Sequence, residues 1–218
     1  SLEEARRQLL ANLVHELGRP LGAVHSALWA LSGRAGGDAA TRQELLTGIE
    51  GEVVRLERLL DNLAQLHDQV LGTLELDLQP INPNDWLRQV LISWEQLALQ
   101  KGLQWELEIP AGLQTFEADP DRLVQAVGNL VNNAIDAMPG GGKIMLKMET
   151  SKENRLVFSI TDTGAGMDEN TVDQIFTPFY TTKTDGKGTG LGLYIVNNIC
   201  KNHGAEISCE SEPGKGTR

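Results

Sequence analysis

The chain has 218 residues, of which 19 are Lys or Arg and 30 are Asp or Glu, so its formal charge at pH 7 is −11. This acidic balance excludes general nucleic-acid binding, which needs a positive field to displace counterions from phosphates. Two cysteines, Cys200 and Cys209, form no disulfide framework and favour a reducing, cytoplasmic compartment. No apolar run approaches the roughly 20 residues that span a bilayer. We therefore expect any membrane anchor to lie in segments outside this sequence, whose C-terminal end is also expected to be truncated.

Residues 1–72 are predicted to form two antiparallel helices that dimerise. The first helix carries an apolar heptad seam made of Leu10, Val14, Leu17, Leu21, Val24, Leu28 and Leu31. A similar seam in the second helix, interrupted by Glu52, consists of Leu45, Ile49, Leu56, Leu59, Leu63, Leu66 and Val70. The glycine-rich residues 33–38 make the turn. Because one hairpin buries little core, two copies are expected to form a four-helix bundle and a homodimer. Packing of one hairpin against the rest of its own chain remains the alternative.

Residues 73–218 show a different pattern and are predicted to form a second domain. Residues 74–78 alternate with period two, as a half-buried strand does. Asn84 is expected to cap a helix that runs from Asp85 to Gln100. Further strands are predicted near residues 104–109, 143–150, 156–161 and 206–210, and further helices near residues 119–138 and 190–203. This order predicts an α+β protein whose second domain is an α/β sandwich rather than a βαβ repeat.

Two polar clusters in the second domain suggest a site for a ligand. Asn129 and Asn133 are four residues apart and share a helix face, and amide oxygens are suitable Mg²⁺ ligands. Asp162 follows a predicted strand, with Gly164 and Gly166 after it. Glycines let the backbone approach a flat ligand, and a fixed carboxylate can accept a hydrogen bond from an exocyclic amine. Taken separately, the first cluster is more often a surface or capping feature, and the second is as often an ordinary turn.

Two further clusters indicate a phosphate site. Residues 176–183 combine an aromatic patch with hydroxyls and the cation of Lys183, and residues 186–193 are glycine-rich and lead into a helix. Backbone N–H groups at such a helix start bind anions, helped by the helix dipole. The spacing of a P-loop is absent, and no parallel βαβ unit of the Rossmann kind surrounds these glycines.

Together, in this order and spacing, the four clusters resemble the N, G1, F and G2 boxes of the Bergerat-type ATP-binding fold. Within that fold they resemble the sensor histidine kinases, and most closely the nitrogen-regulatory type. The resemblance extends over residues 10–217 and implies ATP and Mg²⁺ as cofactors. It assigns the nucleotide to Asn129, Asn133, Asp162, Gly164, Gly166, Thr182, Lys183, Gly188, Thr189, Gly190, Leu191 and Gly192.

The resemblance also implies a role for these residues. Asn133 would coordinate Mg²⁺, with Asn129 nearby, and Asp162 would accept a hydrogen bond from the adenine amine. Thr182 and Lys183 would reach towards the phosphates. The glycines at 188, 190 and 192 would let residues 181–189 act as a lid, and residues 70–73 would form a hinge between the domains.

Among the four histidines, His15 is the predicted phospho-acceptor. The run from His15 to Leu21, with Glu16 and Pro20, resembles the family's box His-Glu-x-x-x-Pro-Leu. A neutral imidazole has a lone pair that can attack the γ-phosphorus, and Glu16 would act as general base. Pro20 is expected to kink the helix or to be a tolerated proline. His25 and His67 lack this context, and His203 is expected at a helix C-terminus, where a cation suits the dipole.

The implied reaction is phosphoryl transfer from ATP to His15 and then to an aspartate of a response regulator. Arg19 stands where the family often has Thr or Asn, a departure that places phosphatase activity in doubt. The ATP hydrolases that share this fold have a Glu base where this chain has Asn129, so water activation would lack its base. A non-catalytic ATP-binding scaffold is the other alternative.

Overall fold

The structure is a computed structural model of residues 1–218. It describes the backbone of residues 2–32, 38–70, 76–183 and 188–218, and the side chains of 17–32, 38–54, 56, 76–183 and 188–218. The chain divides into two compact units. One comprises Ser1–Thr73 with Pro178–Leu191, and the other comprises Leu74–Thr177 with Gly192–Arg218. The predicted division into residues 1–72 and 73–218 stays a prediction.

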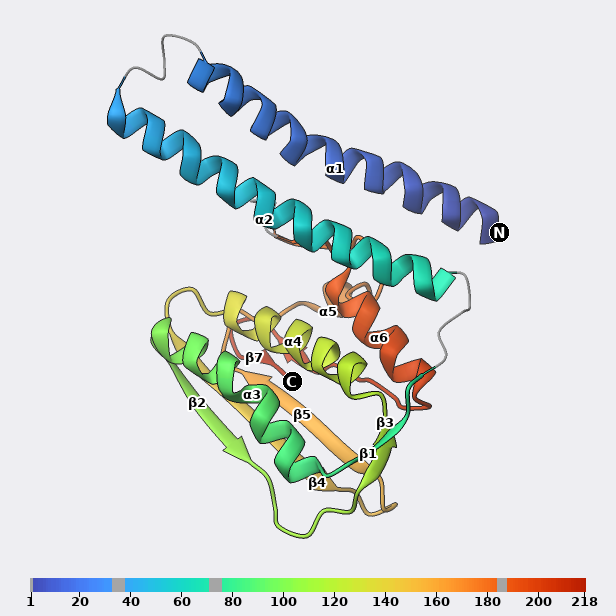
Figure 1. The fold of residues 1–218 in the computed structure, drawn as a ribbon. Coiled ribbons are helices and arrows are strands. Elements are labelled where there is room, and N and C mark those ends of the chain that lie inside the picture. Colours follow the sequence, from blue (N-terminus) through green and yellow to red (C-terminus); the bar gives the residue numbers. More distant parts are fainter. Residues whose placement is uncertain (1, 33–37, 71–75, 184–187) are drawn as a thin grey trace. The chain divides into compact units, whose positions relative to one another are not determined.

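Two long helices form the predicted hairpin: α1 spans Leu2–Ser32 and α2 spans Ala39–Val70, and they pack side by side (Figure 1). The Asp38 carboxylate precedes α2 and accepts hydrogen bonds from the Thr41 hydroxyl at 2.9 Å and the Thr41 N–H at 3.2 Å. These bonds lower the pKa of Asp38. Helix α1 continues through Pro20, which is buried, so the kink there stays a prediction. No helix in the described ranges combines the length and the apolar character that crossing a membrane requires.

The heptad seam of α1 divides into two sets. Leu17, Val24 and Leu31 are partly buried, whereas Leu21 and Leu28 are 55% and 50% exposed. Residues seven apart return to the same side of a helix. One side of the seam is therefore covered within the hairpin, and the other presents apolar side chains that this single chain leaves uncovered.

The second unit is built on a mixed five-stranded sheet in the order β2-β4-β5-β7-β6. The strands are β2 Leu103–Glu108, β4 Gly142–Thr150, β5 Leu156–Asp162, β6 Ser211–Glu212 and β7 Gly216–Thr217. Strand β2 pairs in parallel with β4, and the other pairs are antiparallel. Three helices lie on one face of the sheet in Figure 1, namely α3 Pro83–Gln100, α4 Pro120–Asp136 and α6 Gly192–Asn202. A small sheet pairs β1 Gln79–Ile81 with β3 Phe116–Ala118, and the short α5 spans Glu169–Val172.

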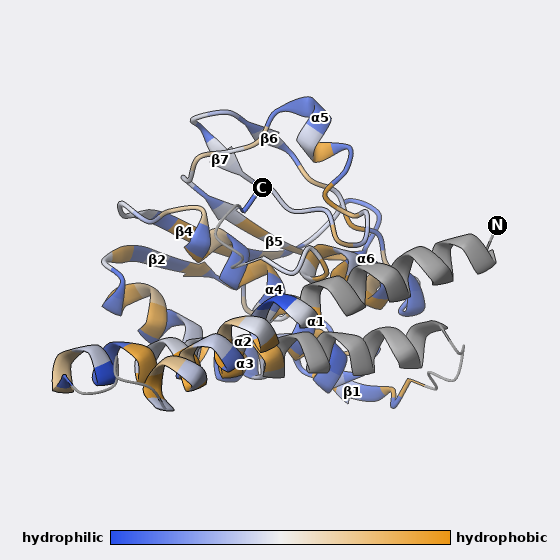
Figure 2. Cartoon of the chain, turned by 90° about the horizontal axis from the view of Figure 1, so that it is seen from above, coloured by the Kyte–Doolittle hydropathy of each residue, from blue (hydrophilic) through white to orange (hydrophobic). Residues whose placement is uncertain are grey.

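The core of this unit lies between the sheet and the helices. Leu87 and Leu91 of α3, Val131 of α4, and Ile144 and Leu146 of β4 are at most 1% exposed. Figure 2 shows hydrophobic and hydrophilic residues mixed along β2 and β4. Alternate residues of a strand point to opposite faces. The hydrophobic ones therefore meet the helices, and the charged ones occupy the other face of the sheet.

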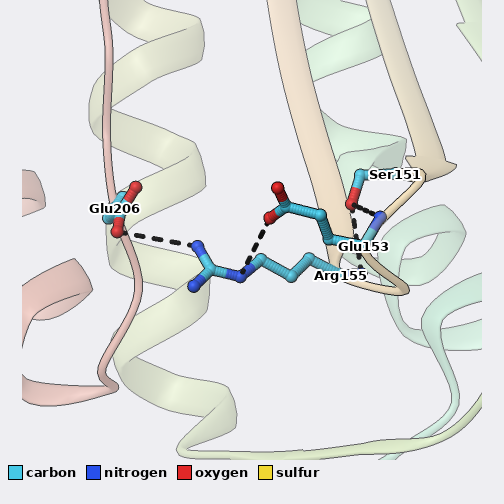
Figure 3. A network of polar contacts seen from close by, with 4 residues as sticks. All are labelled: Ser151, Glu153, Arg155 and Glu206. Carbon is cyan, nitrogen blue, oxygen red and sulfur yellow. Dashed lines mark hydrogen bonds and ion pairs between the residues drawn. The ribbon is translucent and has the colours of Figure 1, made fainter.

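The polar face of the five-stranded sheet and the turns between its strands carry ion pairs at the surface. Lys143 of β4 pairs with Glu106 of β2. In the turn between β4 and β5, the Ser151 hydroxyl accepts hydrogen bonds from the backbone N–H groups of Glu153 and Arg155 (Figure 3). Arg155 also reaches Glu206, with 3.6 Å between Nη1 and Oε1. Exposed pairs of this kind contribute little to stability, about 0–1 kcal/mol each.

Helix starts show one correction to the sequence prediction. The cap of α3 is Asn82, whose side-chain oxygen accepts from the N–H groups of Asn84 at 3.0 Å and Asp85 at 3.4 Å. The prediction of Asn84 as the cap was wrong because Pro83 occupies the first helical position, which its fixed φ suits. Asp119 and Pro120 repeat the same arrangement at the start of α4.

The α+β class is confirmed, and the strand predictions hold in part. The strands predicted near 104–109, 143–150 and 156–161 are β2, β4 and β5, each within one residue. In the segment predicted as strand 74–78, residues 71–75 lie outside the described residues and 76–78 are not in a strand. The strand predicted at 206–210 was wrong: Glu210 pairs its backbone with Arg218, and regular pairing is limited to β6 and β7.

Candidate active site

Asp162 ends β5 with its carboxylate held in place and largely shielded from water. The residue is 7% exposed, and its Oδ1 accepts the Gly164 N–H at 2.8 Å. Burial raises the pKa of Asp162, while backbone hydrogen bonds from Gly164 and Thr217 act in the opposite direction. A partly desolvated, oriented carboxylate is suited to accept a hydrogen bond from a ligand amine.

The two glycines after Asp162 are required by close approach. A Cβ on Gly164 would lie 2.7 Å from the Ala137 carbonyl oxygen, just past the end of α4. Gly166 has φ +65°, and a Cβ there would overlap the Glu212 carbonyl. The loop therefore passes tightly between the end of α4 and the strands β6 and β7, and its role as a pocket wall stays a prediction.

Helix α4 carries the predicted metal-binding face. Asn129 and Asn133 are both partly buried, and the Asn133 carbonyl accepts the N–H of Ala137 at 3.0 Å. Asn133 thus stands one helical turn before the residue that meets Gly164. The described residues contain no group of three or more His, Cys, Asp or Glu that could hold a metal ion. Amide oxygens fit Mg²⁺, which usually takes few protein ligands and completes its shell with phosphates and water.

The start of α6 faces the same helix. A Cβ on Gly192 would lie 3.3 Å from Oδ1 of Asn129. The structure therefore brings Asn129 and Gly192 together, and it brings Asp162 together with Gly164 and the end of α4.

The segment 178–191 belongs to the other compact unit and closes on itself. Phe179 and Gly190 both have φ +66°, and a Cβ on Gly190 would overlap the Phe179 backbone. Thr181 Oγ1 accepts the Lys183 N–H at 3.2 Å, and Thr189 Oγ1 accepts the Leu191 N–H at 3.4 Å.

Within this segment, residues 184–187 of the predicted lid lie outside the described residues. The approach of Thr182, Lys183, Gly188, Thr189, Gly190 and Leu191 to a nucleotide stays a prediction.

The histidines differ in what the structure describes. His15 and Glu16 lie on α1 and His67 on α2, with side chains outside the described set, and His25 is exposed on α1. His203 follows α6, and Gly204 with φ +67° confirms the helix end. Its Nε2 accepts the Asp119 N–H at 3.0 Å, and Nδ1 lies 2.8 Å from the Ile199 carbonyl oxygen. Nε2 therefore presents a lone pair to the Asp119 N–H, because a nitrogen that accepts an N–H carries no proton.

Asp119 and His203 are the residues of this unit that sequence reasoning missed. Asp119 is 8% exposed and lies at a predicted helix start, but its partners are far away in the sequence. The Asp-Pro pair signals a cap, whereas no local pattern signals the bond to His203.

Two known families match the chain. The His Kinase A (phospho-acceptor) domain matches residues 5–69, and the histidine kinase-, DNA gyrase B- and HSP90-like ATPase matches residues 118–218. The catalytic domain of histidine kinase ThkA is 31% identical, with a TM-score of 0.56 over 65% of this chain and 93% of that one. This chain belongs to the sensor histidine kinase family. Sensor histidine kinase ZraS of Salmonella typhimurium (strain LT2) is 35% identical over 214 residues, which are 97% of this chain and 44% of ZraS. The chain thus spans less than half the length of this curated relative.

Two other solved structures share the fold. Full-length ShkA in complex with AMPPNP is 27% identical, with a TM-score of 0.67 over 97% of this chain and 44% of that one. ThkA in complex with response regulator protein TrrA is 23% identical, with a TM-score of 0.77 over 100% of this chain and 62% of that one. At that identity the likeness to the ThkA complex shows the fold alone.

Proposed function

We propose that this chain is the cytoplasmic catalytic core of a dimeric sensor histidine kinase, which phosphorylates its own His15 with ATP and passes the phosphoryl group to an aspartate of a response regulator. The observation that carries the proposal is the oriented, buried carboxylate of Asp162 beside the end of the helix that carries Asn133. Residues 1–72 would act as the dimerisation and phospho-acceptor domain, and residues 73–218 as the ATP-binding domain.

The nucleotide would be held by groups with distinct roles. Asp162 accepts a hydrogen bond from the adenine amine, and the backbone of Gly164 and Gly166 leaves room for the ring. Asn133 would hold Mg²⁺, which would supply charge neutralisation to the phosphates when bound. Lys183 and Thr182 contact the phosphates when residues 181–189 close over the nucleotide. The likeness to ShkA, which was solved with AMPPNP, supports binding of an ATP-like nucleotide by this chain.

His15 supplies the nucleophile. The lone pair of one ring nitrogen forms the bond to the γ-phosphorus while the bond from that phosphorus to the leaving ADP oxygen breaks. The proton on the other ring nitrogen passes to Glu16, which acts as general base. Most of the rate enhancement over the uncatalysed reaction then comes from placing the imidazole in line with the leaving oxygen. The hinge at residues 70–73 would permit the domain motion that brings His15 and the bound ATP together.

Two kinds of partner follow from this function. A second copy of the hairpin covers the exposed seam residues Leu21 and Leu28 and completes a four-helix bundle. A response-regulator receiver domain accepts the phosphoryl group from His15. Arg19 stands where the family often has Thr or Asn, so phosphatase activity forms no part of this proposal.

Incubation of the purified dimer with γ-labelled ATP and Mg²⁺ tests the proposal. We expect protein-bound label that is acid-labile and alkali-stable and that disappears in His15→Gln, while ATP binding persists. Release of free phosphate without labelled protein would instead indicate an ATP hydrolase. Binding of ATP with neither product would indicate a scaffold, and label on another residue would contradict the role of His15.

A further inference from the structure

Asp119 joins three segments that are far apart in the sequence. Its Oδ1 caps α4 by accepting from the N–H groups of Asp121 and Arg122, both at 3.1 Å. Its Oδ2 lies 3.3 Å from the N–H of Asp77, near the start of the second unit. Its own N–H donates to His203 Nε2 at 3.0 Å, just past the end of α6. Capping alone accounts only for the first pair of bonds, so the contact with His203 needs a separate explanation.

The bond to His203 fixes the state of the imidazole. A backbone N–H can only donate, so Nε2 must present its lone pair to Asp119. Nδ1 then carries the ring proton and donates it to the Ile199 carbonyl at 2.8 Å. Both ring nitrogens are therefore used, and the ring is held in one tautomer between the end of α6 and the start of α4.

The same two helices meet again near the nucleotide site. The start of α6 approaches α4 where a Cβ on Gly192 would lie 3.3 Å from Asn129 Oδ1. At 1.5 Å per residue, Asp119 to Asn129 spans about 15 Å and Gly192 to His203 about 16 Å. The helices therefore run antiparallel with matched lengths between the two contacts. If α6 slid along α4, the hydrogen bond between Asp119 and His203 would break and Gly192 would at the same time move away from Asn129.

We propose that the Asp119–His203 clasp, meaning the two hydrogen bonds of the His203 ring, sets the register of α6 on α4 and so positions the nucleotide site. This inference rests on the proposed ATP binding. Asp119 and His203 are positioning residues, because they act through Asn129, Asn133 and Gly192 at the start of α6. The clasp acts about 15 Å from the asparagine face by the same helical rise.

Nucleotide binding by the intact chain tests the clasp without requiring phosphoryl transfer. His203→Leu keeps a bulky apolar side chain but offers no acceptor, whereas His203→Gln places an amide oxygen near the position of Nε2. Asn82→Ala is the matched control, because it removes a helix cap in α3 and leaves the α4–α6 contacts unchanged. ATP titrations are made with Mg²⁺ at a temperature where circular dichroism shows every variant folded. Proton–nitrogen correlation spectra of the imidazole rings report the His203 tautomer.

We expect ATP affinity to fall about fivefold or more in His203→Leu, since small misplacements of binding groups have large effects. His203→Gln and Asn82→Ala should remain within about twofold of the unmodified chain if the loss reflects register rather than stability. Equal affinity in His203→Leu, an equal loss in Asn82→Ala, or no rescue by Gln would each overturn the clasp. Intact ATP binding without label on His15 would instead refute the proposed kinase reaction alone.

Discussion

The helical hairpin exposes several large apolar side chains, whereas the sheet unit buries a core of them and leaves Leu78, Ile92 and Leu99 exposed. In the hairpin, side chains between 41% and 78% exposed include Leu21, Leu28, Trp29, Leu46, Val53 and Val54. In the sheet unit, Leu87, Leu91, Val131, Ile144 and Leu146 are at most 1% exposed. The sheet unit therefore completes its core within one chain, whereas the hairpin has an apolar surface that a second molecule can cover. The comparison teaches that nucleotide binding and dimerisation should be separable by mutation.

The largest effect is expected when the exposed seam becomes charged. We predict that the double variant Leu21→Glu, Leu28→Glu raises the dimer dissociation constant on the order of 1,000-fold, since each buried Leu contributes about 2 kcal/mol. Analytical ultracentrifugation measures this. Gln43→Glu, at an exposed polar position of α2, is the control and should leave the dimer intact. A double variant that stays dimeric would show that these leucines do not form the interface.

A substitution in the sheet unit should impair nucleotide binding and leave the dimer intact. We predict that Asn133→Ala lowers labelling of His15 by about 100-fold, because loss of a metal-site group typically costs 10–100-fold or more. Asn132 is the matched control, since it is adjacent on α4 but exposed, and Asn132→Ala should leave labelling within about twofold. Sedimentation should show both variants to be dimers. Equal losses in the two variants would contradict a specific role for Asn133.

Asp162 allows function and stability to be separated within one unit. Asp162→Asn retains an oxygen for the Gly164 N–H but presents an amide to the ligand, so we expect ATP affinity to fall about tenfold. Stability at pH 7 should not fall, because burial raises the pKa of Asp162 and the ionised carboxylate is the costly form.

The contribution of Asp162 to the free energy of unfolding should depend on pH in a defined direction. With its pKa raised in the folded state, Asp162 contributes stability below its ordinary pKa of 3.8, and this contribution is lost as pH rises through the folded value. Denaturant titrations across this range should show that loss in the unmodified chain and not in Asp162→Asn. A variant less stable than the parent at pH 7 would contradict the prediction.

Helix glycines give the smallest effects and sharpen the comparison of packing. A Cβ on Gly128 of α4 would lie 2.6 Å from Trp94 Cζ2, whereas one on Gly48 of α2 meets nothing within 4 Å. We predict that Gly128→Ala destabilises the sheet unit by about 1–3 kcal/mol through overpacking. Gly48→Ala should stabilise the hairpin by about 0.5–1 kcal/mol through helix propensity. Thermal melting of each variant measures both, and a destabilising Gly48→Ala would place that position inside the dimer interface.

The sequence predicted the elements whose patterns are long and local. The alternation in β4 and β5 and the periodic helices α3, α4 and α6 were located to within two residues. Strand β3 and helix α5 escaped prediction because three or four residues give no readable period. The parallel pairing of β2 with β4 was also missed, since the two strands are separated by β3 and α4.

Prediction of the site followed the same rule. The four-residue spacing of Asn129 and Asn133 fixes a shared helix face, and a carboxylate at a strand end followed by glycines is a local signal. The contact between Asp119 and His203 joins residues 84 apart, so no local pattern contains it.

The pairing of β7 with β5 places the last turn of the described chain next to the Asp162 carboxylate. Thr217 supplies a backbone hydrogen bond to Asp162, and a Cβ on Gly216 would overlap the backbone of Asp162. The amide hydrogen of Thr217 is thus a built-in reporter. Its exchange with deuterated solvent should slow when the base of a nucleotide covers the Asp162 carboxylate. Removal of residues 216–218 should leave that carboxylate open to water.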